Sequence, residues 1–170
     1  ASSAVEMAGS GTLNYYAGIL NKVKTASPQN VKSLPVSEQI MVLMSRLLLP
    51  ERGLKNMDEA AFFKSLVETG AIDKVAVGML KVGNIETAGA TASAIGFVKD
   101  TPANARITFD QDETGAWKVN LGEVLPKASA YYADKFKASK MDVDQHVKNS
   151  IKAFAPNGQF SADLFNPPRN

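Results

Sequence analysis

The residue types best suited to chemistry in this sequence are four tyrosines, which form two adjacent pairs, and a single histidine. A tyrosine hydroxyl in an apolar pocket can donate a hydrogen bond to an oxyanion or to a polar ligand. Tyr15–Tyr16 and Tyr131–Tyr132 both lie in helical patterns, so one ring of each pair is expected to face the core. Packing is the favoured interpretation of both pairs, and a ligand contact is the alternative.

His146 is the only histidine, and the sequence has no cysteine. It lies beside Val147 but off the apolar stripe of its predicted helix, which indicates a surface or partner-contact position. Without cysteine or a second histidine, a metal site would need carboxylates alone to complete it, so we predict no metal site. The absence of cysteine also excludes thiolate catalysis and disulfides, but it does not fix the cellular compartment.

The acidic stretch 110–115 places Asp110, Asp112, Thr114 and a glycine as in the first half of an EF-hand calcium loop. In such a loop the twelfth residue supplies a bidentate carboxylate, and here that residue is Leu121. The flanking segments also alternate like strands, so the stretch is interpreted as an acidic hairpin turn.

No nucleotide motif passes the test of its structural context. Gly9 and Gly11 do not follow a predicted strand, and no glycine-rich loop ends in Lys-Ser or Lys-Thr. We therefore predict no cofactor and leave the catalytic residues unassigned.

Composition and charge exclude two further classes of partner. The 170 residues are 45% hydrophobic and 21% charged, with a formal net charge of +2, and they contain no basic stripe with interleaved aromatic residues. That pattern argues against nucleic-acid binding. The longest apolar run, residues 40–49, is half the length of about 20 residues that a spanning helix needs, so no membrane span is predicted.

Helical spacing of apolar residues predicts three helices before the middle of the chain and two after it. The first is capped by Thr12, and the third ends at Gly70. The second lies between Pro35 and Pro50 and is apolar nearly all round, which places it inside the fold. The two later helices occupy residues 125–154.

Between the helices the apolar pattern changes to a period of two, which predicts strands at 75–82, 85–98, 105–111 and 116–121. Alternation of Val75, Val77 and Met79 supports the first strand. A bend or bulge is expected near Gly89 in the second. In the last, Trp117 alternates with Val119 and Leu121 and is interpreted as a buried sheet-face residue. The short connections predict antiparallel neighbours.

Together these elements predict an α+β fold with helices on a curved antiparallel sheet, followed by two additional C-terminal helices. Residues 1–170 are expected to form one domain. Its parts are a loose N-terminus at 1–11, helices plus sheet at 12–121, helices at 125–154 and an extended tail at 155–170.

The stretches 34–51 and 57–74, with the closing Asp-Glu-Thr-Gly-Ala-Trp-Lys-Val-Asn-Leu of residues 112–121, resemble an uncharacterised bacterial branch of the nuclear transport factor two-like (cystatin-like) superfamily. The resemblance covers residues 12–121. It implies helices packed into the concavity of a strongly curved, cone-like sheet that often leaves a pocket. Members of the superfamily include ketosteroid isomerases and polyketide cyclases as well as non-enzymatic binding or envelope modules.

The resulting expectation is a non-catalytic module that binds a small apolar ligand or docks a protein partner, including a second copy of the chain. The alternative is a small isomerase- or cyclase-type enzyme with a pocket tyrosine, Tyr15 or Tyr16, and a carboxylate. The small-residue opening at 1–4 suits a processed end, so a periplasmic or extracellular location is favoured over the cytoplasm. The candidate pocket-lining residues are Tyr16, Met44, Phe62, Phe97 and Trp117.

Overall fold

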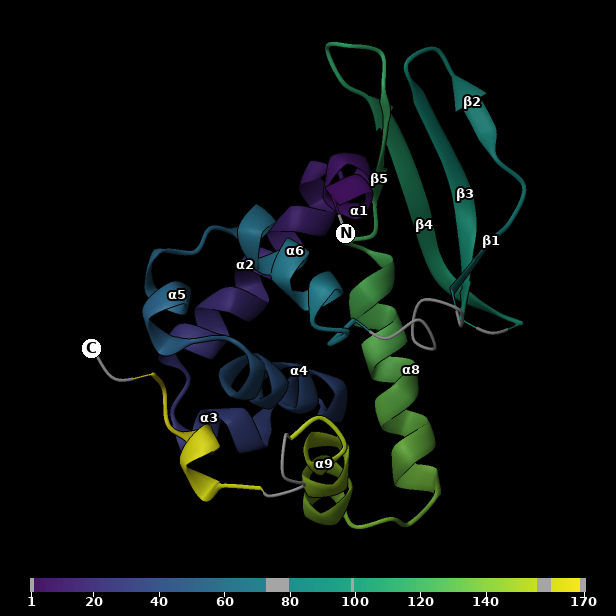
Figure 1. Cartoon of the computed structure of the whole chain (residues 1–170). Helices are drawn as coiled ribbons and strands as arrows, with labels where there is room; N and C mark the ends of the chain where they lie inside the picture. The colour runs from purple at the N-terminus through teal and green to yellow at the C-terminus, as the bar shows by residue number, and fades with distance from the viewer. Residues whose placement is uncertain (1, 73–79, 99, 156–159, 169–170) are drawn as a thin grey trace. The chain divides into compact units, whose positions relative to one another are not determined.

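A computed structural model describes residues 2–72, 80–98, 100–155 and 160–168 (Figure 1). The chain divides into two compact units. The sheet unit comprises Ala1–Tyr16 and Glu59–Ala128, and the helical unit comprises Ala17–Asp58 and Ser129–Asn170. The predicted single-domain organisation stays a prediction. The predicted α+β class is confirmed, with a curled antiparallel sheet that forms a half-barrel.

The helices and strands alternate in blocks along the chain, as the change of apolar period predicts. The helices before the sheet are α1 (Ser2–Met7), α2 (Ser10–Thr25), α3 (Pro28–Ser33), α4 (Val36–Leu48), α5 (Glu51–Asn56) and α6 (Glu59–Glu68). The strands are β1 (Leu80–Val82), β2 (Glu86–Ala88), β3 (Thr91–Val98), β4 (Thr101–Gln111) and β5 (Trp117–Asn120). The chain continues with α8 (Val124–Ala138), α9 (Val143–Lys152) and the 3₁₀ helix η1 (Ala162–Phe165).

All pairings between the described strands are antiparallel, as predicted. β3 and β4 pair along most of their length, β5 pairs with β4, and β1 and β2 pair with opposite ends of β3. The predicted single strand over 85–98 is instead a hairpin, in which Ala88 pairs with Thr91 across a two-residue turn. Gly89 adopts φ +63°, which a residue without Cβ takes at little cost, so the chain reverses where only a bend was expected. Val75, Val77 and Met79 lie outside the described residues.

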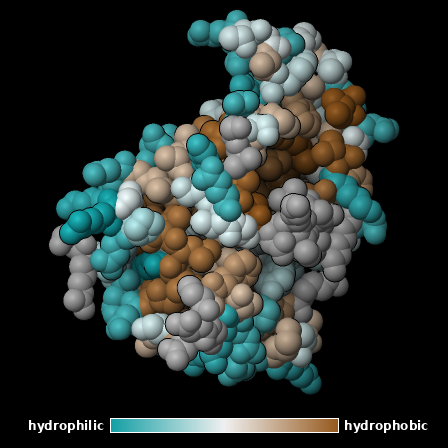
Figure 2. All heavy atoms as spheres, in the orientation of Figure 1, coloured by the Kyte–Doolittle hydropathy of each residue, from teal (hydrophilic) through white to brown (hydrophobic). Residues whose placement is uncertain are grey.

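The core of the sheet unit lies on one face of β4. Ala105 and Ile107 are buried there against Val124 of α8, and the partly buried Leu80 and Phe109 pack against them. Period-two alternation places these residues on a common face, while Arg106 between them is exposed. Figure 2 shows apolar side chains gathered over the sheet and hydrophilic ones at the tip of the β4–β5 hairpin.

The junction of α1 and α2 lies along β5. The Thr12 hydroxyl donates to the Val119 carbonyl at 2.7 Å and accepts from the Leu121 amide at 2.9 Å. The Gly11 amide donates to Asn120 Oδ1 at 2.7 Å. Thr12 is therefore a buried contact with the sheet and not the predicted N-cap, because α2 begins two residues earlier. The N-terminus, predicted to be loose, contains α1, which contacts β5 and α6.

In the helical unit, α4 provides the central buried surface. Val42 and Leu43 are fully buried, and α4 contacts α3, α9 and η1. This position confirms that a helix apolar nearly all round lies inside the fold. The C-terminal tail, predicted to be extended and loosely held, contains η1 and is fixed to α4, because Arg46 bonds to two of its carbonyl groups.

Candidate functional site

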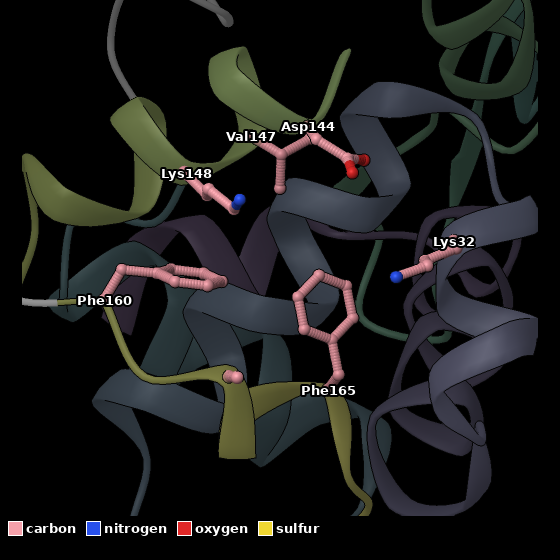
Figure 3. A pocket seen from close by; sticks show the side chains of 7 residues that line it. Lys32, Asp144, Val147, Lys148, Phe160 and Phe165 are labelled. Carbon is pink, nitrogen blue, oxygen red and sulfur yellow. The ribbon is translucent and has the colours of Figure 1, made fainter.

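A pocket of about 190 Å³, partly open to solvent, lies in the helical unit between α9, α3 and the C-terminal segment (Figure 3). It is larger than a cavity of about 150 Å³ that holds benzene, and smaller than the roughly 300–1,000 Å³ of sites for drug-sized ligands. The volume therefore suits a ligand built around one ring or a short chain. The lining residues are Lys32, Asp144, Val147, Lys148, Phe160, Ala162 and Phe165.

The apolar part of this pocket consists of two phenylalanine rings and a valine. The ring centroids of Phe160 and Phe165 are 6.0 Å apart with an interplanar angle of 72°. Such an edge-to-face arrangement is favoured for aromatic pairs. Val147 of α9 is 1% exposed and also lines the hollow. The rings thus present apolar surface to any molecule that enters.

Three charged side chains surround this apolar surface. Lys32 Nζ lies 5.5 Å from the centroid of the Phe165 ring, within cation–π range. Asp144 and Lys148 are separated by one helical turn of α9, and Figure 3 shows both side chains at the pocket. Within the described ranges, none of the three forms an ion pair of 4 Å or less. With two lysines and one aspartate, the rim carries one excess positive charge.

The N-terminus of α9 is fixed by a capping interaction. The Asp142 carboxylate accepts a hydrogen bond from the Gln145 amide at 2.7 Å. Val147 and Ile151 are buried on one side of the helix, as their spacing predicts. Burial of this stripe sets the rotation of α9 and so brings Asp144 to the pocket.

The C-terminal wall of the pocket is fixed by Arg46 of α4. Its Nη1 donates to the carbonyl oxygens of Leu164 and Phe165, at 3.1 and 2.7 Å. Its Nε and Nη2 donate to the carbonyl oxygens of Val23, Lys22 and Ala26, at 2.9, 3.2 and 2.8 Å. Burial lowers the pKa of Arg46, but a guanidinium group stays protonated in proteins, so the side chain keeps its charge. One guanidinium thereby joins α4, the C-terminal end of α2 and the segment that carries Phe165.

His146 is not among the residues that line the pocket, and its side chain contacts α8. Its Nε2 lies 2.7 Å from the Tyr132 hydroxyl oxygen, and its ring centroid lies 4.6 Å from that of Phe136. The predicted surface position is therefore corrected, because the side chain is half-buried between two helices. The alternative, a partner contact, stays a prediction. Burial raises the pKa of Tyr132, which keeps its hydroxyl protonated and able to donate.

Three of the five candidate pocket residues are buried in different parts of the chain. Tyr16 and Phe62, in the sheet unit, are 4% and 0% exposed, and Met44, in the helical unit, is 3% exposed. The Tyr16 ring lies 4.7 Å from that of Phe63 and 5.3 Å from that of Tyr15. None of the three lines the pocket between α9 and the C-terminal segment.

The other two candidates lie on the sheet, away from its buried centre. Phe97 alternates with the buried Val98 and is half-buried on the opposite face of β3. Trp117 is 42% exposed, which corrects its interpretation as a buried sheet-face residue. It shares a face with Val119, but it pairs with Gln111 at the hairpin end of the sheet, beyond the core at Ile107.

The sheet unit has a second, more open hollow of about 340 Å³ beside α2, β4 and β5, lined by Ser10, Gly11, Arg106, Thr108, Asn120, Gly122 and Glu123. Arg106, a cationic side chain at this hollow, is 51% exposed and donates to Glu86 Oε2 at 2.9 Å. The Asn120 side chain also has hydrogen-bond partners within the sheet unit, since its oxygen accepts from the Gly11 amide and its nitrogen donates to Asp110 at 2.5 Å. Two polar side chains of this hollow therefore already have partners within the sheet unit, and the described residues that line it include no aromatic ring.

The buried Tyr16 predicts a loss of stability at alkaline pH. Burial is the main cause that raises its pKa, and Tyr15 adds a coulombic contribution. The folded chain therefore holds this proton more tightly than the unfolded chain. The stabilising contribution of this proton to the free energy of unfolding is complete below the pKa of about 10 that a tyrosine has in the unfolded chain. It is lost as pH rises towards the pKa of Tyr16 in the folded chain, by up to about 1.4 kcal/mol per pH unit.

Urea denaturation of the wild type and of Tyr16→Phe at pH 8, 10 and 11 measures this contribution. We expect the free energy of unfolding to fall less steeply above pH 10 in the variant, which has no proton to lose. Tyr132→Phe, at a less buried tyrosine, serves as the comparison. Parallel curves for wild type and Tyr16→Phe would show that the Tyr16 proton is not held more tightly in the folded chain.

Three further observations bear on the classes of function. Over the part of the chain that the structure describes, no group of three or more histidine, cysteine or acidic side chains is arranged to hold a metal ion. Among the same residues, no helix has both the length and the apolar character to cross a membrane. A scan against protein-family models matches no family, and searches of curated proteins and of solved structures return no significant match.

Proposed function

We propose that this chain is a non-catalytic module that binds a small ligand, and that the ligand occupies the pocket between α9 and the C-terminal segment. The observation that carries the proposal is the pair of phenylalanine rings at the pocket, 6.0 Å apart, with the segment of Phe165 anchored by a buried arginine. An anchored wall supports binding, because the backbone of this segment is already held and has little freedom left to lose when a ligand enters.

The expected affinity follows from the size of the pocket. Burying about 100–150 Å² of apolar ligand surface contributes roughly 2.5–4 kcal/mol at about 25 cal/mol per Å². Association costs reduce this gain, and one ring with a short substituent offers only about ten heavy atoms. We therefore expect dissociation constants on the order of 1 mM for simple probes, which corresponds to about 4 kcal/mol.

The catalytic alternative, a pocket tyrosine with a carboxylate, has less support. A general acid of this kind needs a carboxyl group whose pKa is raised. Asp100 and Asp112 have lowered pKa values, because the first accepts a hydrogen bond from Lys81 and the second mainly from Thr114 and then from Lys118. Both are therefore held ionised near neutral pH.

Membership of the nuclear transport factor two-like superfamily is also a proposal. The curled antiparallel sheet, preceded in the chain by helices, supports it. The ligand site proposed here does not depend on that membership, because its residues come from α3, α9 and the C-terminal segment.

The proposal is tested by filling the pocket and measuring binding of phenylacetamide, a neutral single-ring probe. Ala162 lines the pocket but is exposed, so Ala162→Phe adds a ring there with little cost in stability. In NMR titrations we expect saturable shifts of the Val147 and Ala162 methyl signals in the wild type, and loss of saturable binding in Ala162→Phe. Ala130→Phe, at an exposed position of α8 outside the pocket, should bind as the wild type does.

The outcome that contradicts the proposal is equally direct. If phenylacetamide binds Ala162→Phe as well as it binds the wild type, or if neither phenylacetamide nor its charged analogues cause a saturable shift at these methyl groups, the pocket is not a ligand site.

A further inference from the structure

From the charges around this pocket, we infer that its ligand is a carboxylate joined to an aromatic ring or a short hydrocarbon group, with the ring against Phe160 and Phe165 and the carboxylate towards Lys148 and Lys32. The inference rests on the proposed function, since it names the class of ligand for the same pocket. The inference goes beyond the proposed function, because a neutral apolar molecule would already satisfy the contacts with the two rings, and only the charged side chains favour a carboxylate.

The first step concerns Lys148. Asp144 and Lys148 have the i, i+4 spacing at which acidic and basic side chains commonly pair on a helix. In the described residues, however, their charged atoms are not within 4 Å of each other, and Lys148 has no other ion pair. The Lys148 ammonium group is directed towards the space beside the two rings (Figure 3). It is thus available to a negatively charged group of the ligand.

The second step excludes a cationic ligand. Two phenylalanine rings with an aspartate resemble a site for an ammonium ion, since ring faces attract cations. Here the face of Phe165 is already occupied by the Lys32 ammonium group, 5.5 Å from the ring centroid. A ligand cation would be repelled by the full charges of Lys32 and Lys148, and Asp144 is the one acidic side chain among the described lining residues that would attract it. The same charges favour an anion.

The third step concerns the type of anion. A phosphate with two negative charges is usually held by arginine forks or by several backbone amides. This pocket offers two lysines, which act as point charges, and Asp144 opposes a second negative charge. In addition, the Asp142 carboxylate already accepts from an amide in the first turn of α9. A single carboxylate matches the excess of one positive charge at the rim.

Three probes of nearly equal size separate the charge preference from the binding itself: phenylacetate, phenylacetamide and 2-phenylethylamine, which is a cation at neutral pH. With the full chain in 50 mM salt, we expect phenylacetate to bind about threefold more tightly than phenylacetamide, and the amine to bind most weakly. In 500 mM salt the advantage of phenylacetate over phenylacetamide should largely disappear.

Charge variants then assign the preference to particular residues. Lys148→Met should weaken phenylacetate to the affinity of phenylacetamide, and Asp144→Asn should tighten phenylacetate about twofold, in line with the modest strength of exposed charge pairs. Neither variant should change phenylacetamide binding. Lys137→Met, which removes an exposed lysine of α8 outside the pocket, should leave all three affinities unchanged.

The results distinguish failure of this inference from failure of the proposed function. If phenylacetamide or the amine binds as tightly as phenylacetate, or if Lys148→Met leaves phenylacetate unaffected, the pocket binds ligands but not carboxylates in particular. If none of the three probes binds saturably at Val147 and Ala162, the proposed function fails, and the inference fails with it.

Discussion

Replacing Arg46 by methionine is expected to lower the free energy of unfolding by on the order of 3–5 kcal/mol, in the range for breaking a buried charged interaction. Five carbonyl oxygens accept hydrogen bonds from this guanidinium group. Bonds to charged groups contribute about 1.5–3 kcal/mol each, but carbonyl groups near the surface regain water when the arginine is lost. The total is therefore well below five times the single value.

Arg46→Lys is the matched control for the charge. Lysine keeps the positive charge but has one ammonium group with three donors, which cannot reproduce the fork of the guanidinium. Urea denaturation should therefore place Arg46→Lys between the wild type and Arg46→Met. Equal stability of the three proteins would contradict the claim that the hydrogen bonds of Arg46 stabilise the helical unit. Because Nη1 bonds the carbonyl of Phe165, the methionine variant should also bind phenylacetamide more weakly.

Substituting alanine at two glycines is expected to change stability in opposite directions. A methyl group on Gly122 would lie 2.7 Å from the carbonyl oxygen of Gly11, so the backbone must move. Overpacking of this kind costs about 1–3 kcal/mol. A methyl group on Gly18, in the exposed middle of α2, would meet no atom within 4 Å. Gly18→Ala should therefore stabilise the chain by about 0.5–1 kcal/mol, because alanine favours the helix.

Thermal or urea unfolding of the two alanine variants beside the wild type measures this difference in sign. The loss at Gly122 reports on the contact between the loop after β5 and the start of α2, and the gain at Gly18 shows that the assay detects either direction. A neutral or stabilising Gly122→Ala would mean that Gly11 and Gly122 are not in contact.

Local patterns in the sequence predict the elements well and their tertiary contacts poorly. Alternation in 105–111 places Ala105 and Ile107 on the buried face, and the apolar stripe of the second predicted helix places α4 inside the fold. The sequence around Gly89 predicts a break in the strand, but a bend and a tight turn have the same local composition. The choice between them depends on pairing of β2 with β3, which a single strand pattern does not reveal.

The candidate site could not be predicted, because its walls come from segments far apart in the sequence. Phe160 and Phe165 lie in a tail whose prolines and polar residues predict an extended chain. One signal was present: Arg46 interrupts an apolar run in a helix predicted to be buried. A buried cation needs hydrogen-bond acceptors. In the structure, two of the five carbonyl groups that accept from Arg46 belong to the segment that forms a wall of this pocket.

The cavity residues expected from the family resemblance illustrate a different limit. A large apolar residue on a periodic face is buried whether it lines a pocket or fills the core, so burial of Phe62 and Met44 follows from periodicity alone. Trp117 differs, because alternation predicts a face of the sheet but not how far along each strand that face is covered. Only the position of the core around Ile107 determines that Trp117 lies beyond it.

The central claim, that the helical unit binds a small ligand between α9 and its C-terminal segment, is tested most directly by intermolecular NOEs between phenylacetamide and the chain. We predict NOEs from the probe ring to the methyl groups of Val147 and Ala162. NOEs only to methyl groups of the sheet unit, such as those of Ala94 and Ile107, would contradict the claim and place the ligand on the sheet.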